Sequence, residues 1–348
     1  MKALVLHGNY DIRVEERPDP HPDPGEVAVE VIATGICGSD FHGYSGENGR
    51  RHPGQVMGHE TVGRIAELGP GVTGLATGQL VTVNPVLGCN ECPACAAGQQ
   101  QWCSRRVVLG VAPEISAAFA ERVVVRASNI VALPDEMPEE LGALVEPLAV
   151  GWHAVRRGQA VAEDRVLVIG GGPIGQACLL AARRMGVDNL ALSDVSASRR
   201  ELCAKLGAQV VDPSAGDLAE AVAQSLGGPA TLVLDAVGVS RTVADALAAS
   251  ALGGRVVLVG MGSPQLDLAA YAVSTGERSL IGSFTYNAAE FAETAAWVGT
   301  VPEGLRSLID GRVGWDGAAQ SFDDLARGRS TASKILVFPQ GPPPQEQQ

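Results

Sequence analysis

Long apolar runs are missing from this sequence of 348 residues. Nowhere do about 18 apolar residues follow one another without a charge, which is the length that a membrane-spanning helix needs. The N-terminus also lacks an apolar segment with a basic flank, the mark of a secretory signal. We therefore expect a cytoplasmic protein that does not enter a membrane.

Basic residues are few as well. Lys and Arg together number 26 against 39 Asp and Glu, which gives a formal net charge of −13. Because no basic block offers a binding surface for phosphates, nucleic acid and anionic membranes are not expected partners. Aromatic residues make up only 4% of the chain, so the core must depend on Val, Leu, Ile and Ala.

The sequence does contain a tight cluster of cysteines. Four of the seven cysteines follow the spacing Cys89-x2-Cys92-x2-Cys95-x7-Cys103. In a cytosolic chain, such spacing indicates metal binding more readily than disulfides. Four thiolates can close a tetrahedral zinc site without an open position, so we predict a structural zinc lobe at about residues 88–104. Four free thiols or an iron–sulfur cluster are the alternatives.

Two kinds of pattern divide the chain. Residues 1–150 contain short runs rich in Val and Ile, separated by Gly and Pro, which is typical of a β-barrel or sandwich. In residues 151–278, strand-like and helix-like segments alternate, which predicts a parallel sheet with helices on both faces. The alternation ends at Ser279. The last ten residues, 339–348, are rich in Pro and Gln and should form a mobile tail.

A glycine-rich motif stands in the alternating part, and it reads Gly170-Gly171-Gly172-Pro173-Ile174-Gly175. It follows the strand-like residues 166–169 and opens an apolar helix, which is the setting of a dinucleotide-binding turn. Gly170 would make the turn, Gly172 would let the backbone approach a pyrophosphate, and Gly175 would let the helix pack on the strand. The phosphates would face the N-terminus of the helix, at Pro173 and Ile174.

An acidic residue follows the second strand of this part. Asp194 stands 19 residues after Gly175, where a carboxylate can accept hydrogen bonds from the ribose hydroxyls of adenosine. Because a carboxylate repels a 2′-phosphate, NAD is favoured over NADP. Arg199 and Arg200 follow closely and weaken that preference. A helix N-cap or a turn residue is the alternative role for Asp194.

The densest group of reactive side chains lies near the N-terminus. Cys37, Ser39, Asp40 and His42 fall within six residues, shortly after the apolar run 27–32 and among glycines. We expect them on a tight loop at the end of a strand, because polar groups held at a rigid strand end are where chemistry is usually found.

Three more residues could complete a metal site with Cys37. His59 and Glu60 follow a glycine, and Glu146 is a single acid in an apolar stretch. A reactive zinc needs three protein ligands and one open position, so Cys37 and His59 would be joined by Glu60 or Glu146. Burying Glu146 would be costly without a partner or a metal. The alternatives are a hydrogen-bonded core histidine for His59 and an exposed helix-start carboxylate for Glu146.

Taken together, these motifs resemble one family over essentially the whole chain. The chain resembles the zinc-dependent medium-chain dehydrogenases, the superfamily of alcohol and sorbitol dehydrogenases. The matching segments are residues 35–40, 58–60, the four-cysteine lobe, 146–150, 170–175 and 257–262. Several independent motifs in one order are far more specific than any one of them.

The resemblance implies an α/β fold in which a GroES-like catalytic domain is split around a Rossmann coenzyme domain. Residues 1–150 and 279–338 would form the catalytic domain, and residues 151–278 the NAD-binding domain. It implies two zinc ions per chain. One is structural, and the other is catalytic, on Cys37 and His59 with Glu60 or Glu146, directly or through water.

The resemblance also assigns roles in catalysis. Ser39 would accept the proton of a zinc-bound alcohol, His42 would carry it outward, and Asp40 would orient the zinc histidine. Hydride would pass from carbon to NAD. Val237 with Gly238, and Val259 with Gly260, match turns that border the nicotinamide.

The substrate is the least defined part of the resemblance. The segment after Glu146 is more like that of polyol dehydrogenases, so we expect oxidation of a secondary alcohol, a sugar alcohol or a cyclitol to the ketone. Sorbitol dehydrogenases usually carry an Arg-Tyr pair where this chain has Phe284-Thr285-Tyr286, which puts sorbitol itself in doubt. The expected pocket residues are Tyr44, Phe119, Thr285 and Tyr286.

Three alternatives stay open at this point. They are an amino-alcohol dehydrogenase such as a threonine dehydrogenase, an NADPH-linked carbonyl reductase, and a nucleotide-binding protein without turnover. The resemblance further implies a homodimer or homotetramer.

Overall fold

The computed structural model describes residues 1–47, 49–113 and 115–344, so residues 345–348 of the expected mobile tail lie outside the described residues. The chain divides into two compact units. The first contains Met1–Glu146 and Asn287–Gln348, and the second contains Pro147–Tyr286.

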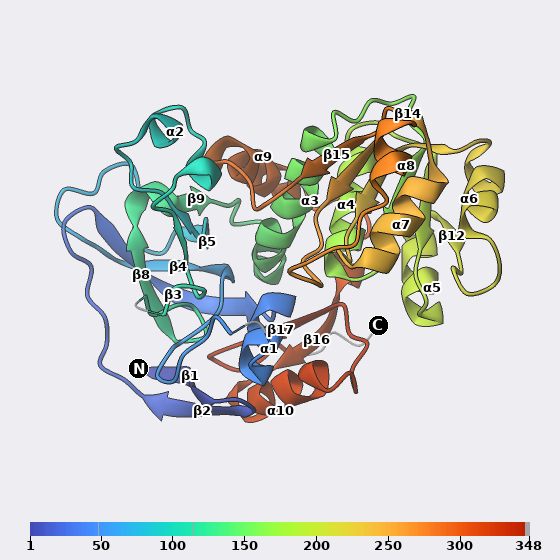
Figure 1. The fold of residues 1–348 in the computed structure, drawn as a ribbon. Helices are drawn as coiled ribbons and strands as arrows, with labels where there is room; N and C mark the ends of the chain where they lie inside the picture. Colours follow the sequence, from blue (N-terminus) through green and yellow to red (C-terminus); the bar gives the residue numbers. More distant parts are fainter. Residues whose placement is uncertain (48, 114, 345–348) are drawn as a thin grey trace. The chain divides into compact units, whose positions relative to one another are not determined.

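The first unit is rich in strands (Figure 1). In chain order its elements are β1 (Lys2–Gly8), β2 (Asp11–Glu16), β3 (Glu26–Gly35), α1 (Gly38–Ser45), β4 (Glu60–Leu68), β5 (Leu80–Val83), β6 (Val86–Leu87), α2 (Pro93–Ala96), η1 (Gln100–Trp102), β7 (Val107–Val108), β8 (Arg122–Arg126), η2 (Ala127–Asn129), β9 (Ile130–Ala132), η3 (Glu139–Leu144), α9 (Ala288–Gly299), η4 (Leu305–Leu308), β16 (Ile309–Val313), α10 (Trp315–Ala326) and β17 (Lys334–Val337).

A seven-stranded sheet organises this unit. Its strands follow the order β16-β17-β3-β4-β5-β9, and β8 also pairs with β3. The register places Gly35 at the end of β3 opposite Glu60 of β4 on one side and opposite Leu336 of β17 on the other. Residues that follow β3, start β4 and start β17 therefore come together, although they are far apart in the sequence.

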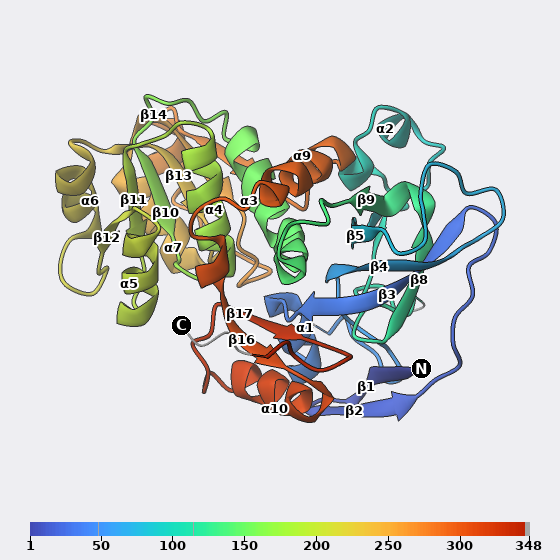
Figure 2. The same cartoon turned by 180° about the vertical axis from the view of Figure 1, so that it is seen from behind.

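The second unit alternates strands and helices (Figure 2). Its elements are most of α3 (Val145–Arg157), then β10 (Val166–Ile169), α4 (Pro173–Arg184), β11 (Leu190–Ser193), α5 (Ala197–Lys205), β12 (Gln209–Val211), α6 (Leu218–Leu226), β13 (Ala230–Asp235), α7 (Ser240–Ala249), β14 (Ser250–Leu258), α8 (Ala270–Ser274) and β15 (Ser279–Gly282).

The six strands of the second unit form a parallel sheet in the order β12-β11-β10-β13-β14-β15. This is the Rossmann order, with the reversal between β10 and β13. Successive strand residues point to opposite faces. Val166 and Val168 pack with α3, α4 and α5, whereas Leu167 and Ile169 pack with α6, α7 and α8. The prediction of a parallel sheet with helices on both faces is confirmed.

One boundary differs from the expectation. The strand at Ser279 was expected to begin the return to the first domain, but β15 pairs in parallel with β14 as the edge strand of the second unit. Leu280 and Ile281 contribute to the hydrophobic clusters on the two faces of this sheet, which fixes the strand there. The chain re-enters the first unit at Asn287.

Candidate active site

Cys37 stands two residues beyond β3, at the start of a helix. Its backbone is extended, and its N–H donates to Asp40 Oδ2 at 3.1 Å, which satisfies a donor at the N-terminus of α1. The sequence predicted a tight loop here, but Ser39, Asp40 and His42 lie on α1 instead. The capping contact from Asp40 allows the helix to begin immediately after the strand.

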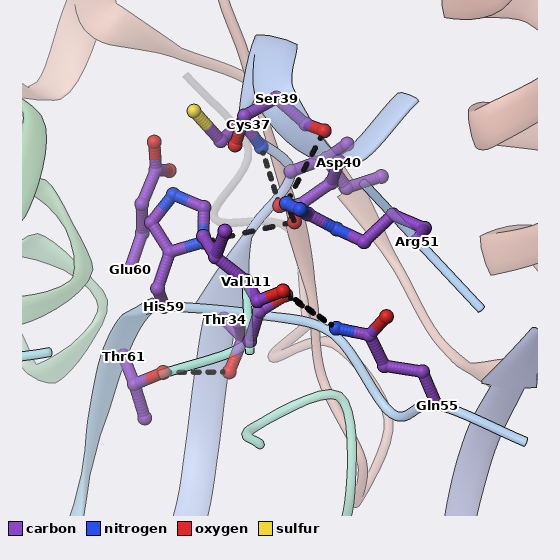
Figure 3. Close-up of polar contacts among 12 residues, drawn as sticks. Thr34, Cys37, Ser39, Asp40, Arg51, Gln55, His59, Glu60, Thr61 and Val111 are labelled. Carbon is purple, nitrogen blue, oxygen red and sulfur yellow. Dashed lines mark hydrogen bonds and ion pairs between the residues drawn. The ribbon is translucent and has the colours of Figure 1, made fainter. Parts of the chain in front are cut away.

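His59 approaches Cys37 from the start of the neighbouring strand. Gly58, just before it, has φ of +102°, and a Cβ there would lie 2.8 Å from the backbone nitrogen of Phe119, so only glycine fits. The ligand atoms of Cys37, His59 and Glu60 all lie within 4.8 Å of one another. Figure 3 shows the three side chains converging.

Glu60 has a partner that the sequence did not indicate. Both of its carboxylate oxygens accept hydrogen bonds from Lys334 Nζ, at 2.7 and 2.6 Å, and both side chains are buried. A Cβ on Gly35 would lie 2.1 Å from Glu60 Oε2, so the glycine leaves room for the ion pair. The only signal in the sequence was a lysine at the start of an apolar strand, 274 residues from Glu60.

Glu146 is buried in the first turn of α3, so it is not an exposed helix-start carboxylate. Burial lowers the pKa of both His59 and Lys334, and the charge of Glu146 is among those that raise it. The site thus gathers a thiol, an imidazole and the Glu60 carboxylate, and Glu146 adds a further negative charge that acts on them. That donor set fits a zinc ion.

Burial and neighbouring charges act in opposite directions on His59. Burial alone would lower its pKa, but Asp40, Cys37 and Glu146 together raise it to about 10. His59 Nδ1 lies 3.6 Å from Asp40 Oδ1, and neither atom has a hydrogen-bond partner within the described residues. A negative environment that favours a cation at His59 is also one that favours a divalent metal.

Ser39 and His42 are one helical turn apart on α1, which brings them to the same face of the helix. Ser39 is half-buried, whereas the His42 side chain is 51% exposed. His42 Nδ1 lies 2.6 Å from Glu47 Oε2. This gradient from buried to exposed is what a path for a proton from a buried site to water requires.

Two of the four expected pocket residues are core residues of the first unit. The Tyr44 ring packs against Tyr10 and Phe322, and the Phe119 ring packs edge-on against Phe322. Tyr44 Oη donates to Asp323 Oδ1 at 3.3 Å. Because both rings are almost fully buried among apolar neighbours, they do not present a surface to a substrate.

The other two expected pocket residues end the second unit. Tyr286 is fully buried. Thr285 has a positive φ of 50°, which is unusual for a β-branched residue, and its Oγ1 is buried without a hydrogen-bond partner within the described residues. Thr285 and Tyr286 therefore stay predicted pocket residues.

The cysteine lobe is formed as the spacing predicted. The sulfur atoms of Cys89, Cys92, Cys95 and Cys103 lie within 4.8 Å of one another, and all seven cysteines of the chain are free thiols. Four sulfurs around one zinc would be about 3.8 Å apart, from Zn–S bonds of about 2.3 Å. Cys89 Sγ and Cys95 Sγ are 3.9 Å apart.

The thiols of the lobe differ in acidity. Hydrogen bonds, first from the backbone of Glu91, lower the pKa of Cys89 to about 6, whereas desolvation raises the pKa of Cys95 to about 11. Four thiolates cannot accumulate charge side by side without a cation to neutralise them. The lobe therefore fits a metal that takes sulfur ligands. Because four cysteines would fill a tetrahedral coordination shell, no position would remain open for a substrate.

The glycine motif has the geometry of a dinucleotide-binding turn. Gly170 has φ of +95°, and a Cβ on Gly175 would lie 1.7 Å from the Gly170 carbonyl oxygen, so the turn and the helix pack closely. α4 begins at Pro173, with Gly172 as its N-cap. A Cβ on Gly172 would meet no atom within 4 Å. That open space at a helix N-terminus fits a pyrophosphate.

Asp194 is held beside this turn. Its Oδ2 accepts the Gly171 N–H at 2.6 Å and its Oδ1 accepts the Ser196 N–H at 2.7 Å. Arg199 Nη1 lies 3.8 Å from Asp194 Oδ2. Ser196, rather than Asp194, is the N-cap of α5, whereas the hydrogen bond from the Ser196 N–H is the contact of a turn residue at Asp194.

Asp235, at the end of β13, is a residue that the sequence did not single out. Its Oδ1 accepts the N–H groups of Val237 and Gly238 at 2.9 and 3.0 Å, and its carbonyl oxygen accepts those of Val259 and Gly260, both at 2.9 Å. Burial raises the pKa of this carboxyl, while the hydrogen bonds from the turn oppose that change.

The two strand-end turns that Asp235 binds also touch each other. A Cβ on Gly238 would lie 2.1 Å from the Gly260 carbonyl oxygen, and a Cβ on Gly260 would lie 2.2 Å from the Val237 carbonyl carbon. These turns lie at the carboxyl ends of β13 and β14, which is the edge of a parallel sheet where ligands bind. Asp235 therefore fixes the edge where a coenzyme would lie.

The fold and the site define a zinc-type dehydrogenase, and comparison with known proteins agrees. The chain matches the family model of the alcohol dehydrogenase GroES-like domain over residues 23–135. It matches that of the zinc-binding dehydrogenases over residues 173–300. The chain belongs to this family of zinc-dependent medium-chain dehydrogenases. The predicted family, fold class and enzyme class are confirmed.

Individual relatives cover nearly the whole chain. "Probable D-xylulose reductase A" of Aspergillus fumigatus is 31% identical over 344 residues, which is 96% of each chain. The structure of galactitol-1-phosphate dehydrogenase from Escherichia coli has a TM-score of 0.89 and 31% identity, and it covers 97% of this chain and 100% of its own.

A third relative was solved with a coenzyme bound. A zinc-binding dehydrogenase from Sinorhizobium meliloti, solved with NADP bound, has a TM-score of 0.89 and 31% identity over 97% of this chain and 99% of its own.

Within the residues that the structure describes, no helix has the length and apolar character needed to cross a membrane.

Proposed function

We propose that this protein oxidises a secondary hydroxyl of a polyol or sugar-derived alcohol to the ketone, with zinc and NAD. The observation that carries the proposal is the convergence of Cys37, His59 and Glu60 within 4.8 Å, in a chain that also has a buried Glu146 and a complete dinucleotide turn. Zinc would supply a Lewis acid that acidifies the alcohol, and NAD would accept the hydride.

In this proposal the protein ligands of the catalytic zinc are Cys37, His59 and Glu146. Glu60 is the less suitable third ligand, because both of its oxygens are already bound by Lys334. Asp40 orients His59 by facing its Nδ1, which leaves Nε2 for the metal. The four cysteines of the lobe hold a second, structural zinc.

The chain's own groups would move the proton. Ser39 would accept it from the substrate hydroxyl, and His42, one turn further along α1, would pass it to water. Glu47 Oε2, 2.6 Å from His42 Nδ1, would orient the imidazole.

Zinc binding at the catalytic site should release a proton near neutral pH. The raised pKa of His59, about 10, means that its imidazole is protonated in the metal-free protein, whereas zinc binds the neutral ring. Zinc affinity should therefore rise with pH up to that value. Calorimetric titration in two buffers of different ionisation enthalpy measures the released proton, and buffer-independent heats would contradict the prediction.

We expect kcat/KM to be about 100-fold higher with NAD than with NADP. The reason is a repulsion of about 3 kcal/mol between the Asp194 carboxylate and the 2′-phosphate of NADP, which corresponds to that ratio. Asp194 cannot swing away from a 2′-phosphate, since both of its oxygens are held by backbone N–H groups. Arg199 is already directed at Asp194. Steady-state kinetics with both coenzymes check this. Equal values, or a variant Asp194→Ser with unchanged preference, would contradict it.

Replacing Gly172 by Ala should weaken NAD binding by about tenfold, a loss of about 1.4 kcal/mol, without lowering the melting temperature. The added methyl group would meet only open space in the protein, and φ at this position is −71°, which Ala adopts readily. The matched control is Gly8→Ala in the first unit, where a Cβ also meets nothing within 4 Å. Fluorescence titration with NAD should show no change for this control.

The substrate class rests on the relatives that act on pentulose and galactitol phosphate, as their names state. A screen of polyols, cyclitols, secondary alcohols and amino alcohols with NAD tests it. We expect NADH formation with at least one polyol or cyclitol. Turnover confined to amino alcohols, or confined to carbonyl reduction with NADPH, would replace this proposal with the corresponding alternative. A homodimer or homotetramer in the cytoplasm remains our prediction.

A further inference from the structure

A buried arginine lies beside the candidate metal site, in the segment between α1 and β4. The Arg51 side chain is only 1% exposed, although arginine is almost never buried without a partner. Neither the glycine motif nor the predicted ligand set explains a guanidinium at this position. It must therefore serve the groups around it.

Arg51 contacts two residues of the first turn of α1. Its Nη2 donates to the Ser39 carbonyl oxygen at 3.3 Å and lies 3.7 Å from Asp40 Oδ1. Asp40 is fully buried, and the same Oδ1 lies 3.6 Å from His59 Nδ1 on the other side. Figure 3 shows Asp40 between the guanidinium and the imidazole.

The fold leaves a path for this side chain. A Cβ on Gly43 would lie 2.3 Å from Arg51 Cγ, so the aliphatic part of Arg51 crosses α1 where the helix has no side chain. Glycine within a helix costs stability relative to alanine. Gly43 is therefore explained by the room that it gives to Arg51.

Arg51 also balances charge. Each of the two buried acids beside the ligand residues faces a buried cation of its own, because Asp40 faces Arg51 and Glu60 faces Lys334. Without Arg51, the carboxylate of Asp40 would lose the group that holds it from the side opposite His59. The carboxylate would then be held only through its Oδ2, by the Cys37 N–H, and Oδ1 would lose its fixed direction.

We propose that Arg51 is a positioning residue of the catalytic metal site. It fixes the first turn of α1 through the Ser39 carbonyl, and it holds Asp40 so that Oδ1 faces His59 Nδ1. His59 is thereby kept in the orientation and tautomer that present Nε2 to the metal. This inference rests on the proposed zinc-dependent function.

Metal binding, rather than turnover alone, tests the proposal. The protein is loaded with Co²⁺ at the catalytic site, and its visible absorption bands and its competition with a chelator are recorded. Arg51→Ala should lower the affinity of this site for the metal about 10- to 100-fold, as is typical when a group that orients a ligand histidine is lost. It should also shift the bands. Arg51→Lys should recover part of the affinity.

Two further variants separate positioning from general stability. Gly43→Ala should raise the helix propensity of α1 and yet reproduce the metal-site defect, because its methyl group displaces Arg51. Arg50→Ala, which removes the same charge from the exposed neighbouring position, should bind metal like the unmodified protein. In an Asp40→Ala background, Arg51→Ala should have no additional effect on the metal affinity.

Unchanged affinity and bands in both Arg51→Ala and Gly43→Ala would overturn the proposal. If Arg51→Ala fails to fold, Arg51→Lys and Gly43→Ala still decide the matter. The proposed alcohol oxidation and the positioning role of Arg51 can also be contradicted separately. A protein that shows this pattern of metal binding but oxidises no alcohol contradicts the proposed function alone, whereas an active protein whose metal binding ignores Arg51 contradicts only the present inference.

Discussion

Replacing Cys37 by Ser should abolish alcohol oxidation and remove one of two zinc ions per chain, while NAD affinity stays unchanged. The thiolate is lost from a ligand group whose atoms lie within 4.8 Å of one another, and a serine hydroxyl is a poor zinc ligand. Lewis-acid activation contributes several kcal/mol, so turnover should fall by at least about 1000-fold. NAD affinity should persist because the dinucleotide turn belongs to the second unit.

Three measurements check the Cys37 variant: NADH formation, zinc content by mass spectrometry, and fluorescence titration with NAD. Cys178→Ala is the matched control, because this buried thiol lies on α4, in the hydrophobic cluster of the second unit. It should retain both zinc ions and most of the activity. A Cys37→Ser protein with two zinc ions and undiminished turnover would show that the catalytic assignment is wrong.

Replacing Lys334 by Met should lower the free energy of unfolding of the zinc-loaded protein by about 3–5 kcal/mol. The substitution keeps the aliphatic length but leaves the buried carboxylate of Glu60 without its cation. Glu60 has no route to water, because its side chain is 1% exposed and lies against Gly35 at the centre of the sheet.

Urea denaturation followed by circular dichroism measures this loss, and a double variant separates charge from packing. Glu60→Gln with Lys334→Met removes both charges and should recover most of the stability, since a neutral buried pair costs far less than one unpaired charge. Equal destabilisation in the single and double variants would mean that the ion pair itself contributes little. If the Lys334→Met variant kept its stability because Glu60 had become a ligand of the zinc, the proposed role of Glu146 would be contradicted.

Functional groups that are close in the sequence could be predicted from the sequence. The four cysteines of the lobe fall within 15 residues, and the glycine motif is a contiguous turn whose packing depends on Gly170 and Gly175 themselves. Local chain geometry alone brings such groups together. The alternation of strands and helices in the second unit is also local, so the parallel sheet could be predicted.

Residues that join the site across the sheet could not be predicted in the same way. Lys334 and Glu60 meet only because the register places β17 and β4 on either side of the end of β3. Arg51 reaches Asp40 because Gly43 opens a path over α1, which depends on the direction of a helix that the sequence suggested was a loop. Asp235 belongs to none of the motifs that the sequence showed.

The expected pocket residues could not be predicted for a different reason. Tyr44 and Phe119 were expected to line the pocket, but their rings meet Phe322 in the hydrophobic core of the first unit. Which face of a helix or strand is buried depends on the partner that packs on it. Here that partner is α10, which begins almost 200 residues after Phe119 and still further after Tyr44.

The central claim is that this chain oxidises a polyol or secondary alcohol with zinc and NAD, and one measurement tests it most directly. NADH formation is followed over a panel of such alcohols, first with the zinc-loaded protein, then after chelation, and then after zinc is returned. We predict turnover with at least one polyol or cyclitol, its loss on chelation and its recovery with zinc. A correctly folded protein with both zinc sites filled that forms no NADH with any member of the panel would contradict the account.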